Sequence, residues 1–223
     1  EATMSDRPNL FVSGLGRCGT TMVMTMLDAG GFPVTGPRPS YEPAERWRGG
    51  RPDMDWLPAQ GGRAVKWIDP THHFTLPGRL TQRPVIILME RNPREQARSQ
   101  VKLLSMTGMK GLGRRAEKAM ERSIKKDVPP MRAHLRNSAI VYGIDFEDIL
   151  ENPFWAARKL GRLVAHHYGA DFDDEVAARV VIPRHPSCAP DLSMETTILP
   201  MIAAELNLTT ATLIAAHHGG NHE

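Results

Sequence analysis

The pattern of apolar and polar positions divides the chain into short apolar strands, each followed by a helical pattern. Residues 84–89 form a continuous apolar run, which is typical of a strand covered on both faces. We expect strands that begin at Leu10 and cover residues 64–70, 84–89 and 138–146, and helices that start near Gly19, run from Arg94 to about Ser105, and open at Glu147. This order predicts an α/β fold in which a parallel β-sheet is flanked by helices.

The first predicted strand runs into a glycine-rich turn and then into a helix. Glycines at 14, 16 and 19 allow the backbone to take positive φ and to approach a ligand closely. The N-terminus of the following helix has a partial positive charge and free N–H groups, so this turn predicts a phosphate or sulfate site. The expected ligand-binding residues are Gly14, Gly16, Arg17, Cys18, Gly19, Thr20 and Thr21.

The glycine spacing matches a Walker A loop, but the residues after it do not. Thr20 and Thr21 stand where an NTPase has Lys and then Ser or Thr, and the nearby cation is Arg17. The run Arg-Cys-Gly-Thr-Thr resembles instead a loop of the sulfotransferase family. In that family a Lys or Arg followed by Ser-Gly-Thr-Thr grips the 5′ end of the sulfuryl donor PAPS (3′-phosphoadenosine 5′-phosphosulfate). Cys18, in the Ser position, departs from this pattern.

A second segment resembles the same family. Arg91, with Asn-Pro after it, follows the apolar run 84–89, and Ser99 comes eight residues later. This arrangement resembles the sulfotransferase segment that binds the 3′-phosphate of the donor. Because Arg91 leaves the strand tip and Ser99 lies on the second turn of the next helix, the two are expected to form a charged pocket for a phosphomonoester. Residues 146–153 also resemble a late, mainly architectural element of the family.

The resemblance covers residues 9–165 and implies a P-loop NTPase-like sulfotransferase topology. It also implies transfer of a sulfuryl group from PAPS to a hydroxyl or amine of a small-molecule or glycan acceptor, which leaves adenosine 3′,5′-bisphosphate. No metal is expected. In such a reaction the protein mainly aligns the reactants and stabilises charge on the bridging oxygen, for which Arg17 and Lys66 are suited.

The general base is expected at the end of the strand 64–70. Many sulfotransferases have their catalytic His two residues after a Lys, and alignment of Lys66 to that pattern puts Ile68 there. Another branch has a Lys-Asp-Pro-x-His-like segment, which Asp69-Pro-Thr-His72 resembles. We therefore expect His72 as the base, with Asp69 and then His73 as the next candidates and Glu42 in reserve.

Length and composition limit the remaining possibilities. With 223 residues we expect one domain, with a site-lining loop region at 33–63 and a C-terminal extension at 183–223. The two cysteines lie far apart, one inside the glycine loop, which argues against a disulfide framework, and no zinc spacing is present. The chain contains no apolar run of membrane-spanning length and no signal-peptide pattern, so we expect a cytoplasmic protein without a membrane partner. A net charge of +3 suits an anionic small molecule as well as nucleic acid, and we expect no nucleic-acid partner.

Two other function classes stay open. One is a P-loop small-molecule or nucleotide kinase that uses ATP and magnesium, with Arg17 in place of the Walker lysine. The other is a non-catalytic nucleotide-binding module.

Residues 107–126 combine a glycine segment with a basic helix that we expect to break at Pro129-Pro130, and they form either a lid or, more simply, a solvated helix face.

Overall fold

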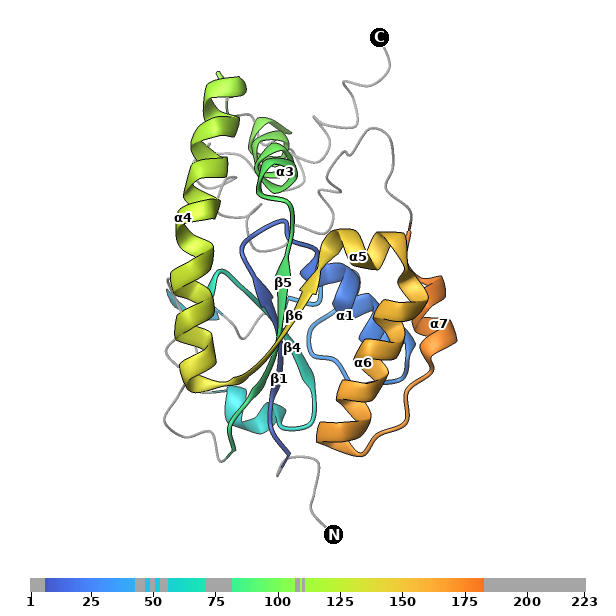
Figure 1. The fold of residues 1–223 in the computed structure, drawn as a ribbon. Coiled ribbons are helices and arrows are strands. Elements are labelled where there is room, and N and C mark those ends of the chain that lie inside the picture. The colour runs from blue at the N-terminus through green and yellow to red at the C-terminus, as the bar shows by residue number, and fades with distance from the viewer. Residues whose placement is uncertain are drawn as a thin grey trace.

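The fold is built on four parallel strands with helices on both sides (Figure 1). It was obtained as a computed structural model that describes residues 7–42, 47–48, 51–52, 56–70, 82–106, 109 and 111–182. The elements in chain order are β1 (Leu10–Gly14), α1 (Thr20–Ala29), β2 (Trp47–Arg48), β3 (Arg51–Pro52), the short 3₁₀ helix η3 (Leu57–Gln60), β4 (Ala64–Ile68), β5 (Val85–Glu90), α3 (Pro93–Met106), α4 (Arg114–Ser138), β6 (Ile140–Asp145), α5 (Phe146–Glu151), α6 (Pro153–Tyr168) and α7 (Asp174–Arg179).

The strand order is β4-β1-β5-β6, and every pairing in this sheet is parallel. Val12 of the central strand β1 pairs with Lys66 of β4 and with Ile87 of β5. The predicted α/β class, a parallel sheet flanked by helices, is therefore confirmed. Because all four strands point the same way, their carboxyl ends meet at one edge of the sheet, which is where ligands bind in open α/β folds.

Two hydrophobic clusters cover the two faces of the sheet. Side chains of α1, α6 and α7 pack with alternate residues of the central strands, among them Leu10 and Ile87, on one face. On the other face, α3 and α4 pack against the remaining alternate residues, among them Phe11 and Trp67. Since β1 is buried along its whole length, its continuous apolar sequence is explained by cover on both sides.

Helix α4 differs from the expectation. A break at Pro129-Pro130 was predicted, but the helix continues through both prolines to Ser138. Each proline lacks an N–H donor, and this costs free energy in a helix interior. The packing of Met131 and Leu135 in the core beyond the prolines outweighs that cost.

Two further segments are more divided than the sequence suggested. The single helix expected from Glu147 onward is split into α5 and α6 at Asn152, whose side chain accepts a hydrogen bond from the Trp155 N–H and caps α6. The region 33–63 contains the paired two-residue strands β2 and β3 and the helix η3. None of the described helices is both long enough and apolar enough to cross a membrane.

Candidate functional site

The turn between β1 and α1 has the positive φ expected of its glycines at Gly14 and Gly19 but not at Gly16. Gly14 and Gly19 have positive φ of 154° and 101°, and Arg17 between them lies in the left-handed region at 68°. A Cβ atom on Gly19 would overlap the Phe146 ring, and one on Gly14 would overlap the Met89 carbonyl oxygen. The turn therefore requires glycine at both ends, for conformation and for space.

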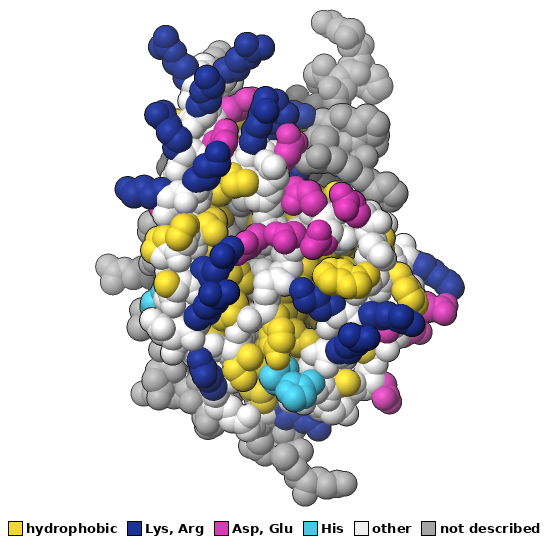
Figure 2. Space-filling model, in the orientation of Figure 1, with side chains coloured by type: hydrophobic (Ala, Val, Ile, Leu, Met, Phe, Trp, Pro, Cys, Tyr) yellow, Lys and Arg dark blue, Asp and Glu magenta, His cyan; other side chains and the backbone are white. Residues whose placement is uncertain are grey.

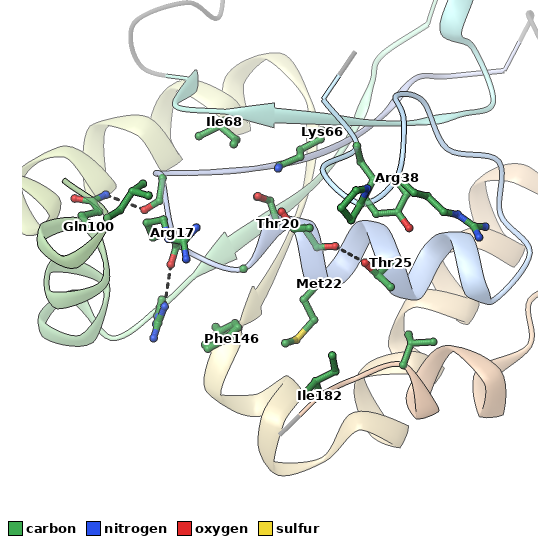
Figure 3. Close-up of a pocket in the computed structure, with 18 of the residues that line it drawn as sticks. Arg17, Thr20, Met22, Thr25, Arg38, Lys66, Ile68, Gln100, Phe146 and Ile182 are labelled. Carbon is green, nitrogen blue, oxygen red and sulfur yellow. Dashed lines mark hydrogen bonds between the residues drawn. The ribbon is translucent and has the colours of Figure 1, made fainter. Parts of the chain in front are cut away.

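Side chains from α3 hold the carbonyl groups of this turn by hydrogen bonds. The Gln96 amide donates to the Leu15 and Gly16 oxygens at 3.0 and 2.8 Å. The Gln100 amide also donates to the Gly16 oxygen, at 2.8 Å (Figure 3). Arg91 donates from Nη1 to the Arg17 oxygen at 3.1 Å. These donors engage three successive carbonyl groups of the turn. The N–H groups of Met22 and Val23 donate to the Gly19 oxygen. Anion binding by the other N–H groups of the turn and of the start of α1 stays a prediction.

Arg17 and Arg91 lie together beside the turn. The Arg17 Nε donates to the Ser99 hydroxyl at 3.2 Å, and the Arg91 guanidinium lies 4.5 Å from the centre of the Phe146 ring. The structure thus brings Arg17, Arg91 and Ser99 together, although the Ser99 hydroxyl is a partner of Arg17 and Ser99 is buried. Direct contact of Ser99 with a 3′-phosphate stays a prediction.

A cavity of about 760 Å³ opens over the turn and along α1 (Figure 3). Predicted site residues that line it are Gly16, Arg17, Gly19, Thr20, Thr21, Lys66 and Arg91. The rest of its lining includes an apolar wall that contains Met22, Leu103, Met120, Phe146 and Ile182. The cavity therefore combines a cationic end, where the strands terminate, with apolar surface that suits a ring or an alkyl group.

Lys66 reaches this cavity from the middle of β4 with its side chain directed toward the start of α1 (Figure 3). Its ammonium group is buried and donates to the Glu42 carboxylate at 3.0 Å and to the Ser40 carbonyl oxygen at 2.9 Å. A buried cation is stable only when it is paired and hydrogen-bonded. Glu42, a reserve candidate from the sequence, is thus the described carboxylate that contacts Lys66.

Cys18 does not line the cavity. Its thiol is buried in the core, and burial raises its pKa to about 12, although the N–H groups of Thr20 and Cys18 and the charges of Lys66 and Arg91 act to lower it. The side chain is therefore neutral at physiological pH. Any contribution of Cys18 to ligand binding comes from its backbone.

The predicted base segment lies at the end of β4 and is only partly described. Asp69 has a left-handed φ of 58°, its N–H donates to the Gly14 oxygen at 2.9 Å, and it does not line the cavity. Ile68, at the position where many sulfotransferases have His, does line it. His72 and His73 lie outside the described residues, so their assignment stays a prediction.

The carboxylates at the ends of β5 and β6 form a separate cluster. Two nitrogens of the Arg132 guanidinium group, Nε and Nη2, donate to the Glu90 carboxylate, and the two contacts of Nη2 are 2.5 and 2.6 Å. Burial, with the charges of Asp148 and Glu90 next in size, raises the pKa of Asp145. Among the described residues no three His, Cys, Asp or Glu side chains are grouped as metal ligands.

The far end of the cavity has a polar network that sequence reasoning missed. The Asp28 carboxylate on α1 accepts from Arg38 Nε and from the Tyr41 hydroxyl at 2.8 Å, and all three residues line the cavity. Burial acts to raise the pKa of Asp28, but these hydrogen bonds outweigh it and hold the pKa below its ordinary value. Gln96 and Gln100 were also missed by the sequence analysis. They are four residues apart in α3 and therefore share one face of that helix, with Ser99 between them in the sequence, and this spacing was their only signal.

No family model and no curated protein sequence matches this chain. Among solved structures, the chain is similar to a sulfotransferase from Alicyclobacillus acidocaldarius, with a TM-score of 0.40 and 15% sequence identity, over 93% of this chain and 98% of that chain.

Proposed function

We propose that this protein is a sulfotransferase that moves a sulfuryl group from PAPS to a hydroxyl or amine of a small-molecule or glycan acceptor and releases adenosine 3′,5′-bisphosphate. The observation that carries the proposal is the convergence of the glycine turn, the N-terminus of α1 and Arg17, Lys66 and Arg91 on one cavity. Two sequence segments that resemble sulfotransferase motifs, at 14–21 and 91–99, supply the turn, Arg17 and Arg91.

The residues present fit such a donor. Adenosine 3′,5′-bisphosphate and its sulfated form have anionic groups at both ends of the ribose. Arg17 and the N–H groups at the start of α1 suit the 5′ end, and Arg91 suits the 3′-phosphate because a guanidinium binds a phosphomonoester through paired hydrogen bonds. When bound, the donor would supply the activated sulfuryl group.

The protein residues then have separable tasks. Lys66 and Arg17 stabilise negative charge that grows on the bridging oxygen during transfer. The N–H groups of α1 fix the 5′ end, so that the acceptor and the leaving group lie in line. The apolar wall, which includes Phe146 and Met120, excludes water that would otherwise compete with the acceptor.

A base must take the proton of the acceptor. We assign this role to His72, with Asp69 as the second candidate and His73 as the third. Glu42 is the alternative within the described residues, because its carboxylate already contacts Lys66 at the cavity. If Glu42 accepted the proton, Lys66 would remain beside a neutral acid with its hydrogen bond to Ser40 intact.

Calorimetry with nucleotides tests the proposal. Adenosine 3′,5′-bisphosphate should bind about 10- to 150-fold more tightly than AMP, since a charge-assisted contact contributes about 1.5–3 kcal/mol. Arg91→Gln should remove most of that preference, and Arg94→Gln, on an exposed position of α3, should leave it unchanged. Equal affinity of the original protein for both nucleotides would remove the sulfotransferase proposal.

A further inference from the structure

The charge of the chain is unevenly distributed. Residues 94–136, which include α3 and α4, contain twelve Lys and Arg but four Asp and Glu, a formal charge of +8 in a chain whose total is +3. The remainder of the chain therefore has a formal charge of −5. Such local asymmetry indicates a surface for an anionic partner more directly than the total charge does.

Helix geometry gathers the cations of α4 on one side. At about 100° per residue, all of them fall within an arc of about 120°, while the buried Ile124, Met131 and Leu135 lie on the opposite side, against the core. Glu117, Glu121 and Asp127 fall outside that arc. The basic stripe consists of Arg114, Arg115, Lys118, Arg122, Lys125, Lys126, Arg132 and Arg136.

The stripe is long, straight and accessible. From Arg114 to Arg136 it extends about 33 Å at 1.5 Å per residue, and all its members except the half-buried Arg132 are exposed. Figure 2 shows Lys and Arg side chains spread along the side of the molecule that α4 forms. Lys125 pairs with Glu121 and Arg132 with Glu90, whereas the other six form no ion pair within the part of the chain that the structure describes.

We infer that the basic stripe of α4 is a docking surface for a linear anionic polysaccharide. A flexible, extended chain with carboxylate or sulfate groups can follow a straight row of cations over its whole length, and each contact releases counterions. This surface lies on the side of α4 away from Met120, the residue through which that helix lines the cavity. Docking there would hold a polymer near the protein without occupying the cavity.

Other polyanions fit the stripe less well. Single-stranded nucleic acid binds through stacking on aromatic side chains, and α4 contains no Phe, Tyr or Trp. A duplex turns fully in about 34 Å, so its phosphates would leave a straight stripe of this length. An interfacial membrane helix inserts apolar side chains, but the large apolar residues that are exposed in the described structure, Met109, Phe154, Trp155, Val176 and Ile182, all lie outside α4.

A titration with heparin, a linear sulfated polysaccharide, tests this inference at 150 mM salt, without any nucleotide. The triple variant Lys118→Gln, Arg122→Gln, Lys126→Gln should bind heparin about 10- to 100-fold more weakly, because three contacts are lost. The matched control Arg158→Gln, Arg162→Gln, Arg179→Gln removes the same charge from α6 and α7 and should change the affinity by less than about twofold. Thermal unfolding and adenosine 3′,5′-bisphosphate affinity should be unchanged in both variants, which separates this test from that of the proposed function.

Three outcomes would overturn the inference. The first is no binding of heparin by the original protein at this salt concentration. The second is an equal loss in the stripe variant and in its control, which would show a response to net charge alone. The third is tighter binding of a 24-base-pair DNA duplex, of single-stranded RNA or of phosphatidylserine vesicles than of heparin.

Discussion

Lys66 and Glu42 show how single side chains link the sheet to the site. Lys66 interrupts an otherwise apolar strand, and its ammonium group is retained in the interior because Glu42 and the Ser40 carbonyl oxygen receive it. Glu42 is 24 positions earlier in the chain, so no local pattern connects it to Lys66. The pair places a cation at the cavity while its charge is balanced by the Glu42 carboxylate.

The choice of base can be resolved with single substitutions. His72→Ala should lower turnover by about a hundredfold or more and leave adenosine 3′,5′-bisphosphate affinity nearly unchanged, because a base contacts the acceptor and not the nucleotide. Arg17→Ala should lower both the turnover and the affinity for adenosine 3′,5′-bisphosphate. The measurement is turnover with PAPS and a panel of hydroxyl and amine acceptors. Normal turnover in His72→Ala, Asp69→Ala and His73→Ala would transfer the role to Glu42.

Cys18 predicts a pH dependence of stability. Its pKa is raised to about 12 by burial, so between about pH 9 and 12 the folded state retains a proton that the unfolded state loses. The stabilisation is therefore fully present below pH 9 and decreases as the pH rises, by up to about 1.4 kcal/mol per pH unit. In urea unfolding from pH 8 to 10.5, the original protein should lose more stability than Cys18→Ala. Parallel pH profiles of the two proteins would contradict this account.

At the scale of elements, α4 shows packing that overrides local preference. Pro129 and Pro130 are exposed and interrupt the hydrogen bonding of the helix, yet the helix continues because its inner face is buried on both sides of them. Replacing Pro129 by Ala should raise the free energy of unfolding by about 2 kcal/mol, since Ala restores a donor and is the better helix residue. Urea unfolding measures the change, with Ala133→Ser, also exposed on α4, as a control of small effect. A loss of stability in Pro129→Ala would mean that the core contacts of Met131 require a bend at the prolines.

The elements that could be predicted from sequence are those with a local signal. The apolar run of β5 and the glycine turn after β1 each specify their structure within a few residues, and both were found where expected. The contacts of Gln96 and Gln100 with the turn join positions about 80 residues apart. Helix α7 and the split between α5 and α6 depend on the caps Asp173 and Asn152, whose short polar side chains are common in loops as well.

The whole molecule determines what the site can bind. The turn belongs to β1, the donors that hold it belong to α3, and Lys66 comes from β4, so the cationic end of the cavity exists only when the sheet and the helices on both faces are assembled. A ligand that fits this end should therefore stabilise the entire fold. At one hundred times its dissociation constant such a ligand adds about 2.7 kcal/mol to the free energy of unfolding.

Thermal unfolding with and without a chelator then separates the proposed function from its kinase alternative. Saturating adenosine 3′,5′-bisphosphate should raise the melting temperature by about 5–10 °C, and EDTA should leave that shift unchanged. The physical reason is that Arg17, Lys66 and Arg91 form the cationic end of the cavity, while Glu90, the carboxylate that ends β5, is held by Arg132. If instead ATP gave the larger shift, and EDTA abolished it while magnesium restored it, the cavity would be that of a P-loop kinase, because such enzymes hold their nucleotide through the metal ion.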